Sequence, residues 1–183
     1  MEQEIEFRRV FEQVTVAACE DLFRRYGVTV RCADERADPI SPEFFLCSVI
    51  GFTGRDVRGT LVLALTEALS GLSNPVAGGS SSATTDRVTH RDWVGELSNQ
   101  LLGRIKLDLL RWGIEISLNL PALLLGRHLA PLPRAQLKPL KFTLAKGAAA
   151  VWIEVETRAG LKLEAPRDLE DQGPEAGDAL LFD

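Results

Sequence analysis

Two strand-like segments that follow each other closely place the strongest constraint on the fold of this chain. Phe44 to Phe52 and Val57 to Leu65 are both rich in β-branched and apolar residues, and only four residues separate them. This pattern predicts a hairpin, and hence antiparallel pairing. The glycines around the turn, in GFTGRDVRG (51–59), also allow a phosphate-binding loop. No Gly-Lys-Ser/Thr follows them, however, so the turn is the favoured interpretation.

The other predicted elements continue this hairpin order. An amphipathic helix is expected over residues 3–26 with Gly27 as its C-cap, and a second over 89–112, capped by Thr89 and ended by Gly113. Further strands are expected at 28–32, 114–120, 140–144 and 149–156, with a short helical turn after Pro121 and a Gly/Ser-rich loop over 70–88. Because helices between successive strands are absent, we predict an α+β fold, a two-layer sandwich of long helices on a mostly antiparallel sheet.

Length and composition limit the domain organisation and the class of partner. The 183 residues allow one domain of ordinary size, which we place at 1–163, followed by an acidic and mobile tail at 164–183. A net charge of −5 argues against a nucleic-acid-binding surface. Three scattered cysteines, the absence of an apolar leader and an apolar run broken by Pro121 indicate a cytoplasmic protein with no membrane segment.

A polar stripe on the second helix is the candidate functional site. Asp92, Glu96 and Asn99 are spaced i, i+4 and i+7, which places them on one face, and Gly103 continues that face. A glycine inside a helix lowers stability by about 1 kcal/mol relative to alanine, so close approach of another backbone would explain it. Taken alone, the stripe is more typical of a solvated helix surface than of a functional site.

The longer spacing carries a family resemblance. Asp92, three residues, Glu96, two residues, Asn99, 21 residues and Pro121 resemble the signature of the CheC/CheX/FliY chemotaxis phosphatases. The string ELSNQLLG, from Glu96 to Gly103, is similar to the core of that signature, and the predicted hairpin is similar to the first hairpin of the family. Only one copy of the motif is present, which is the CheX pattern. The resemblance implies a CheC-like fold and, as in CheX, a homodimer.

The resemblance also implies a chemistry. The family hydrolyses the aspartyl phosphate of a CheY-like response regulator, and Asn99 matches the residue that orients the attacking water. Glu96 matches the residue that pairs with the regulator's lysine, and a general-base role suits it less because an anionic phosphoryl group repels it. Asp92 either binds the regulator or favours the helix N-terminus, and Gly103 lets the regulator approach. We expect no cofactor or metal site in this chain, because the regulator supplies Mg²⁺.

Alternatives remain at this point. The chain could be a CheX-like module that binds a regulator or motor component without hydrolysis, or a structural subunit of a flagellar switch. His90 and His128 are too few for a zinc site, and Ser98 lacks a neighbouring base for a serine hydrolase. Leu123 to Leu125 are either packed or form a partner patch. For the homodimer, the strands ending near Leu120 and Leu144 are the candidate edges, with the stripe left exposed.

Overall fold

The computed structural model describes residues 2–33, 44–73, 83–129, 138–144, 147–158, 160–164 and 166. Most of the expected acidic tail, the middle of the expected Gly/Ser loop and the His128 side chain lie outside these residues. Within the described residues, none of the helices combines the length and apolar character needed to cross a membrane.

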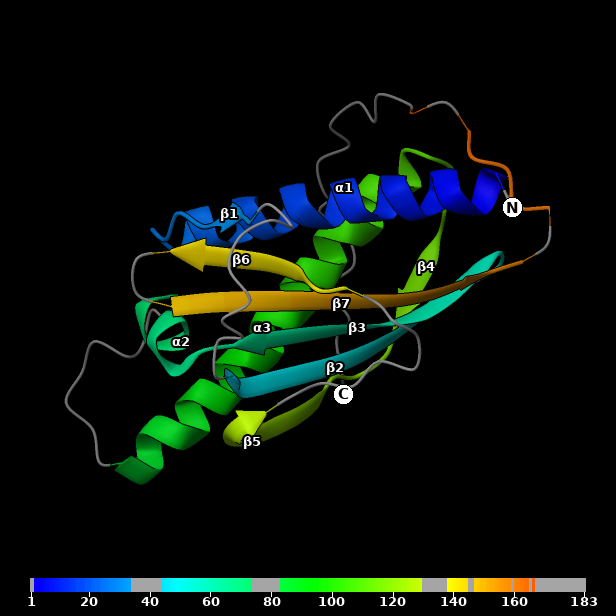
Figure 1. The fold of residues 1–183 in the computed structure, drawn as a ribbon. Helices are drawn as coiled ribbons and strands as arrows, with labels where there is room; N and C mark the ends of the chain where they lie inside the picture. Colours follow the sequence, from blue (N-terminus) through cyan, green and yellow to red (C-terminus); the bar gives the residue numbers. More distant parts are fainter. Residues whose placement is uncertain are drawn as a thin grey trace, which may run out of the picture.

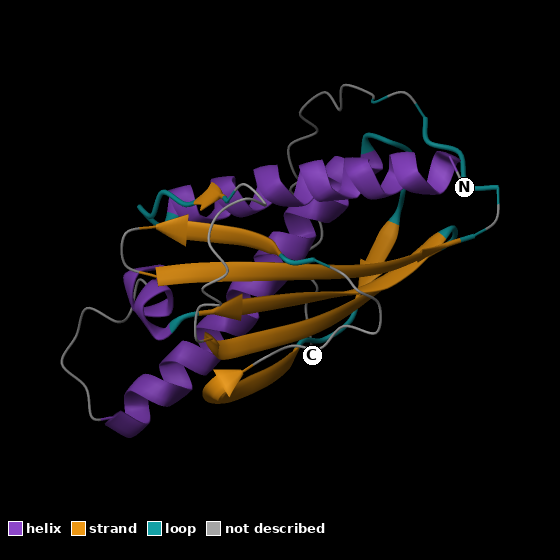
Figure 2. Ribbon diagram, viewed as in Figure 1, coloured by secondary structure: helices purple, strands orange, loops and turns teal. Residues whose placement is uncertain are grey.

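A seven-stranded sheet forms one layer of the protein (Figures 1 and 2). Its order is β1-β6-β7-β3-β2-β4, with β5 also paired to β2, and every pair is antiparallel. The strands are β1 (Arg31–Cys32), β2 (Phe44–Gly54), β3 (Val57–Leu65), β4 (Ile116–Leu118), β5 (Ala122–Leu129), β6 (Leu140–Leu144) and β7 (Gly147–Thr157). The predicted hairpin is confirmed as β2 and β3, joined through Arg55 and Asp56, and the α+β antiparallel fold class is confirmed with it.

The outer edge beyond β2 is one strand interrupted in the middle. β4 pairs with residues 52–54 of β2, and β5 continues in the same direction along residues 44–49. Between the two, three steps along β2 from Phe52 to Val49 match four steps from Leu118 to Ala122, so the edge contains a bulge of one extra residue. Pro121 lies in this bulge, where no hydrogen bond between the strands requires the N–H that proline lacks. The helical turn expected after Pro121 is therefore wrong, because edge pairing with β2 decides the conformation of this segment.

Two long helices cover one face of the sheet. They are α1 (Glu2–Arg25) and α3 (Ala83–Leu110), and the short α2 (Glu67–Ser73) follows β3. In Figure 1, α1 lies along the upper part of the sheet and α3 crosses behind the strands. At the end of α3, Gly113 has a φ of +74° and the Ile114 N–H bonds the Leu109 carbonyl, as expected for a glycine C-cap.

The start of α3 differs from the sequence prediction. The helix begins at Ala83, so Thr89 lies inside it and the predicted cap at Thr89 is wrong. The expected loop over 70–88 is also partly helical, since α2 extends to Ser73. The reason is that residues 83–88 carry no apolar stripe, so periodicity alone did not extend the helix to them.

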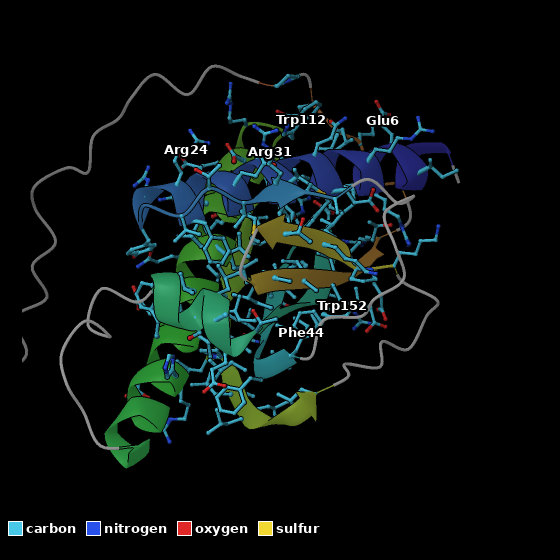
Figure 3. The ribbon with its side chains drawn as sticks, turned by 60° about the vertical axis from the view of Figure 1, so that its left-hand side comes forward. Glu6, Arg24, Arg31, Phe44, Trp112 and Trp152 are labelled. Carbon is cyan, nitrogen blue, oxygen red and sulfur yellow. The ribbon has the colours of Figure 1, made fainter. Side chains whose placement is uncertain are left out.

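The main core lies between the helices and the sheet. Phe11 of α1 stacks on Phe52 of β2, with ring centroids 5.5 Å apart. From α3, Val94, Leu97, Leu101, Ile105 and Leu109 are completely buried in the same cluster. A smaller cluster lies on the opposite face of the sheet, where Phe44 and Trp152 meet edge to face at 5.9 Å (Figure 3). One side of α3 is thus buried in this core, and its other side faces outward.

Candidate active site on α3

The predicted polar stripe lies on the outward side of α3. Asp92, Glu96 and Asn99 are exposed and Gly103 is half-exposed, whereas Leu97 and Leu101 on the opposite side are completely buried. The helical pitch places the four stripe residues one turn apart along a single face. The structure therefore brings these predicted residues together on an accessible surface.

The turn that carries the stripe is fixed from below. Ser98 is completely buried, and its hydroxyl donates to the Val94 carbonyl at 2.9 Å and lies 2.5 Å from the hydroxyl of Ser48 on β2. A buried hydroxyl pair of this kind ties the position of the helix to that of the strand, because breaking it would leave polar groups unsatisfied. Ser98 is consequently a structural residue rather than an exposed nucleophile.

Glu96 is held from the side by two residues that the sequence did not indicate. The Gln100 side-chain amide donates to Glu96 Oε1 at 2.6 Å, and the Tyr26 hydroxyl donates to Gln100 Oε1 at 2.8 Å. Tyr26 follows α1 and packs edge to face on Trp93 of α3, with ring centroids 4.7 Å apart. The i, i+4 spacing of Glu96 and Gln100 was visible in the sequence, but the Tyr26 contact spans 74 residues.

Asp92 pairs with its neighbour Arg91 at 3.1 Å, and both side chains are exposed. An exposed ion pair of this kind contributes little to stability. The lengthened helix also removes the N-terminal explanation for Asp92, because Asp92 now lies more than two turns from Ala83, and the helix dipole acts only within the first turn.

The two glycines of α3 differ in their surroundings. A Cβ added at Gly95 would meet Leu123 of β5 at 3.2 Å, whereas one added at Gly103 would meet no atom within 4 Å. Gly95 thus lets the edge strand that follows Pro121 pack against the helix, one residue before Glu96. The packing of the described residues gives no corresponding reason for Gly103.

The cysteines and histidines lie outside the stripe. Burial raises the pKa of the Cys47 thiol to about 11 and also raises that of Cys19, while burial and then Glu20 raise the pKa of Cys32. All three therefore remain protonated near neutral pH and are poor nucleophiles. Within the described part of the chain, no three His, Cys, Asp or Glu side chains gather as metal ligands, and His90 Nδ1 lies 2.8 Å from the Ser70 hydroxyl.

Similarity to solved structures decides the fold family. No protein-family model matches this chain, and no curated protein matches it in sequence. The chemotaxis protein CheX from Vibrio vulnificus superposes with a TM-score of 0.68 at 18% identity, covering 80% of this chain and 99% of that one. The chain has the fold of the CheX and CheC-like proteins.

Two further structures with the CheX fold resemble this chain. A CheC-like superfamily protein from Shewanella sp. PV-4 has a TM-score of 0.68 at 19% identity, covering 80% of this chain and 97% of that one. CheX from Borrelia burgdorferi, solved as a CheX–CheY–BeF₃–Mg²⁺ complex, has a TM-score of 0.63 at 14% identity, with coverage of 80% and 97%. The CheC-like fold expected from the sequence motif is thus confirmed.

Proposed function

We propose that this chain is a CheX-type phosphatase that hydrolyses the aspartyl phosphate of a CheY-like response regulator, in chemotaxis or related two-component signalling. The observation that carries the proposal is the exposed pair Glu96 and Asn99, one turn apart on α3 of a CheX fold. Neither side chain contributes to the core, so packing does not explain their identity.

Asn99 is the proposed water-positioning residue. Phosphoryl transfer passes through a loose transition state, so placing a water in line with phosphorus is most of the catalytic task. A carboxamide can both donate to and accept from that water, and it stays neutral beside the anionic phosphoryl group. Asn99 is exposed, and among the described residues its side chain has no hydrogen-bond partner that would compete.

Glu96 is the proposed docking residue. Its carboxylate would pair with the lysine beside the regulator's aspartyl phosphate, which fixes the position of Asn99 over phosphorus. Mg²⁺ would be bound by the acidic pocket of the regulator and enters the site as part of the substrate. Asp92 lies one turn before Glu96 on the same face and would contact the rim of the regulator.

The glycine at position 103 is an argument for a macromolecular substrate. A glycine at this helix position lowers stability by about 1 kcal/mol, and no packing within the described residues requires it. A bare helix surface beside the catalytic pair instead allows the loops of a partner to approach closely. The solved Borrelia CheX complex contains CheY, and a CheY-like regulator is the partner proposed here.

The proposal includes a cytoplasmic homodimer. One of the two strands expected at its interface is β6, which ends at Leu144. β1 pairs with β6 at Phe142 and Thr143, so this part of β6 is not an open edge. The β4/β5 edge remains, and Leu120 in its bulge is 92% exposed.

Light scattering of the wild type and of Gly103→Trp should give a dimer mass for both, with regulator binding lost only in the variant. A monomeric wild type would refute the dimer, and a Gly103→Trp monomer would place the interface on the stripe.

The test of the function is dephosphorylation of purified CheY-like regulators by the wild type and by Asn99→Ala. The wild type should speed loss of the phosphoryl group, and Asn99→Ala should lower kcat by about 10²-fold because water placement is lost. Unfolding midpoints should stay the same, since Asn99 is outside the core. Tight binding without acceleration would instead identify a non-catalytic binding module, and an Asn99→Ala protein as active as the wild type would refute the assigned role.

A further inference from the structure

The carboxylate of Glu96 belongs to a hydrogen-bonded chain that begins at the edge of the core, at the half-buried Tyr26. Its Oε1 accepts from Gln100 Nε2 at 2.6 Å, and Gln100 Oε1 accepts from the Tyr26 hydroxyl at 2.8 Å. The Tyr26 ring rests on Trp93, which is 8% exposed. An exposed side chain on the surface of α3 is thereby connected to the interface between α1 and α3.

The direction of this chain is fixed by its chemistry. An ionised carboxylate only accepts hydrogen bonds, so the NH₂ group of Gln100 must face Glu96. The carbonyl of Gln100 then faces Tyr26, whose hydroxyl donates to it. Both bonds are satisfied in only one orientation of the amide, so the three side chains act as one unit.

Local backbone structure places Tyr26 at this position. Tyr26 comes directly after α1, and Gly27 follows with a φ of +74° while the Val28 N–H bonds the Phe23 carbonyl. This closed C-terminal turn holds Tyr26 against α3. Beside it, Arg104 of α3 pairs with Asp21 of α1, which fixes the two helices relative to each other.

We propose that Gln100 and Tyr26 are positioning residues that hold Glu96 ready for the regulator's lysine; this rests on the proposed function. Oε1 is anchored by Gln100, while Oε2 has no hydrogen-bond partner among the described residues and faces a docking lysine unopposed. A free glutamate would lose its rotamer freedom on binding, and ordering one such side chain changes affinity by about two- to tenfold. Here that ordering is complete before the regulator arrives.

The proposal predicts a specific kinetic signature. Tyr26→Phe removes only the hydroxyl, and Gln100→Leu removes the bond to Glu96. Both should raise the KM for phosphorylated regulator by about two- to tenfold and leave kcat unchanged, because Asn99 keeps its place. In a Glu96→Ala background, Tyr26→Phe should have no further effect on KM, since its effect passes through Glu96.

Two controls separate positioning from stability. Gln13→Leu changes an exposed glutamine of α1 in the same way as Gln100→Leu and should leave KM unchanged. Unfolding curves identify any variant that has lost its structure. A KM that does not rise in Tyr26→Phe, or that rises equally in the Glu96→Ala background, would overturn the positioning role.

Two further measurements keep this test separate from that of catalysis. If the wild type binds a beryllofluoride- and Mg²⁺-loaded regulator without hydrolysing the phosphorylated form, the catalytic proposal fails. The positioning role is then tested by binding affinity, in which Tyr26→Phe and Gln100→Leu should show the same fold-changes as those expected for KM. In the free protein, the Gln100 side-chain amide NMR signals should be shifted from random-coil positions and should move toward them in Glu96→Ala, which removes the acceptor of the amide N–H. Random-coil signals in the wild type would refute the chain of bonds whatever the regulator does.

Discussion

The two sides of α3 differ in what determines their residues. On the inner side, Val94, Leu97, Leu101, Ile105 and Leu109 are completely buried. On the outer side, Asp92, Glu96 and Asn99 are exposed, and Gly103 has open space where a side chain would be. One helix therefore carries a surface set by packing and a second surface that packing leaves unspecified.

This contrast indicates which residues of α3 carry information about function. A buried leucine is explained by the core, so its identity gives no evidence about chemistry. An exposed glutamate, an exposed asparagine and an uncovered glycine at one-turn spacing have no such explanation, and these are the residues for which we propose a partner. Variants on the two sides should therefore have different effects. Inner variants should change the free energy of unfolding, and outer variants should change the affinity for the proposed regulator.

The largest expected effect is that of Leu101→Ala on the inner side. Removing a completely buried leucine side chain should lower the free energy of unfolding by about 2–5 kcal/mol, because it loses apolar burial and leaves a cavity. Urea denaturation followed by circular dichroism measures this. A loss below about 1 kcal/mol would mean that the inner side is less tightly packed than the structure shows.

Glu96→Lys should have the next largest effect, and on binding alone. The new ammonium would face the regulator's lysine, so affinity should fall by about ten- to a hundredfold. The free energy of unfolding should change by no more than about 0.5 kcal/mol, as for an ordinary surface substitution. Glu12→Lys makes the same charge change at an exposed position of α1 and serves as the control. Equal losses of affinity in both variants would indicate a general charge effect instead of a specific contact.

Gly103→Ala gives the smallest and most discriminating change. Because its Cβ would meet nothing within 4 Å, the variant should be more stable than the wild type by about 0.5–1 kcal/mol, while regulator affinity falls. Gly95→Ala should gain less stability than Gly103→Ala, since its Cβ would meet Leu123 at 3.2 Å and the leucine side chain would have to move. Thermal unfolding and a binding titration on the same samples test both. If Gly103→Ala kept full affinity, the glycine would have no part in docking.

The sequence predicted those elements whose pattern is complete within the segment. The β2/β3 hairpin was found because both strands are strongly β-forming and the turn between them is short. The inner stripe of α3 identified that helix, but its first turns carry no stripe and were assigned to a loop. β5 was misassigned because its run of leucines also suits a helix, and only pairing with β2 decides the outcome.

The candidate site was predictable only along α3 itself. Asp92, Glu96, Asn99 and Gly103 were found because they share one helix face and one motif. Tyr26 and Gln100 were missed because their bond exists only after α1 packs on α3, and no local spacing records a contact over 74 residues. Residues proposed to take part in the reaction thus share a motif, whereas the residues proposed to position them do not.

The one-residue bulge between β4 and β5 also determines which side of the edge strand faces inward. Side chains alternate along a strand, so an uninterrupted edge with Ile116 and Leu118 against the helices would point Leu123 toward the opposite face. The extra residue reverses this odd–even parity, and Leu123 packs on Gly95 instead. With one residue fewer between Leu118 and Ala122, the side chains of β5 would point to the opposite faces of the sheet. Leu123 would then no longer pack beneath the turn of α3 that carries Glu96. The length of this segment, and not only its composition, therefore decides which side chains of β5 pack beneath the turn of α3 that carries Glu96.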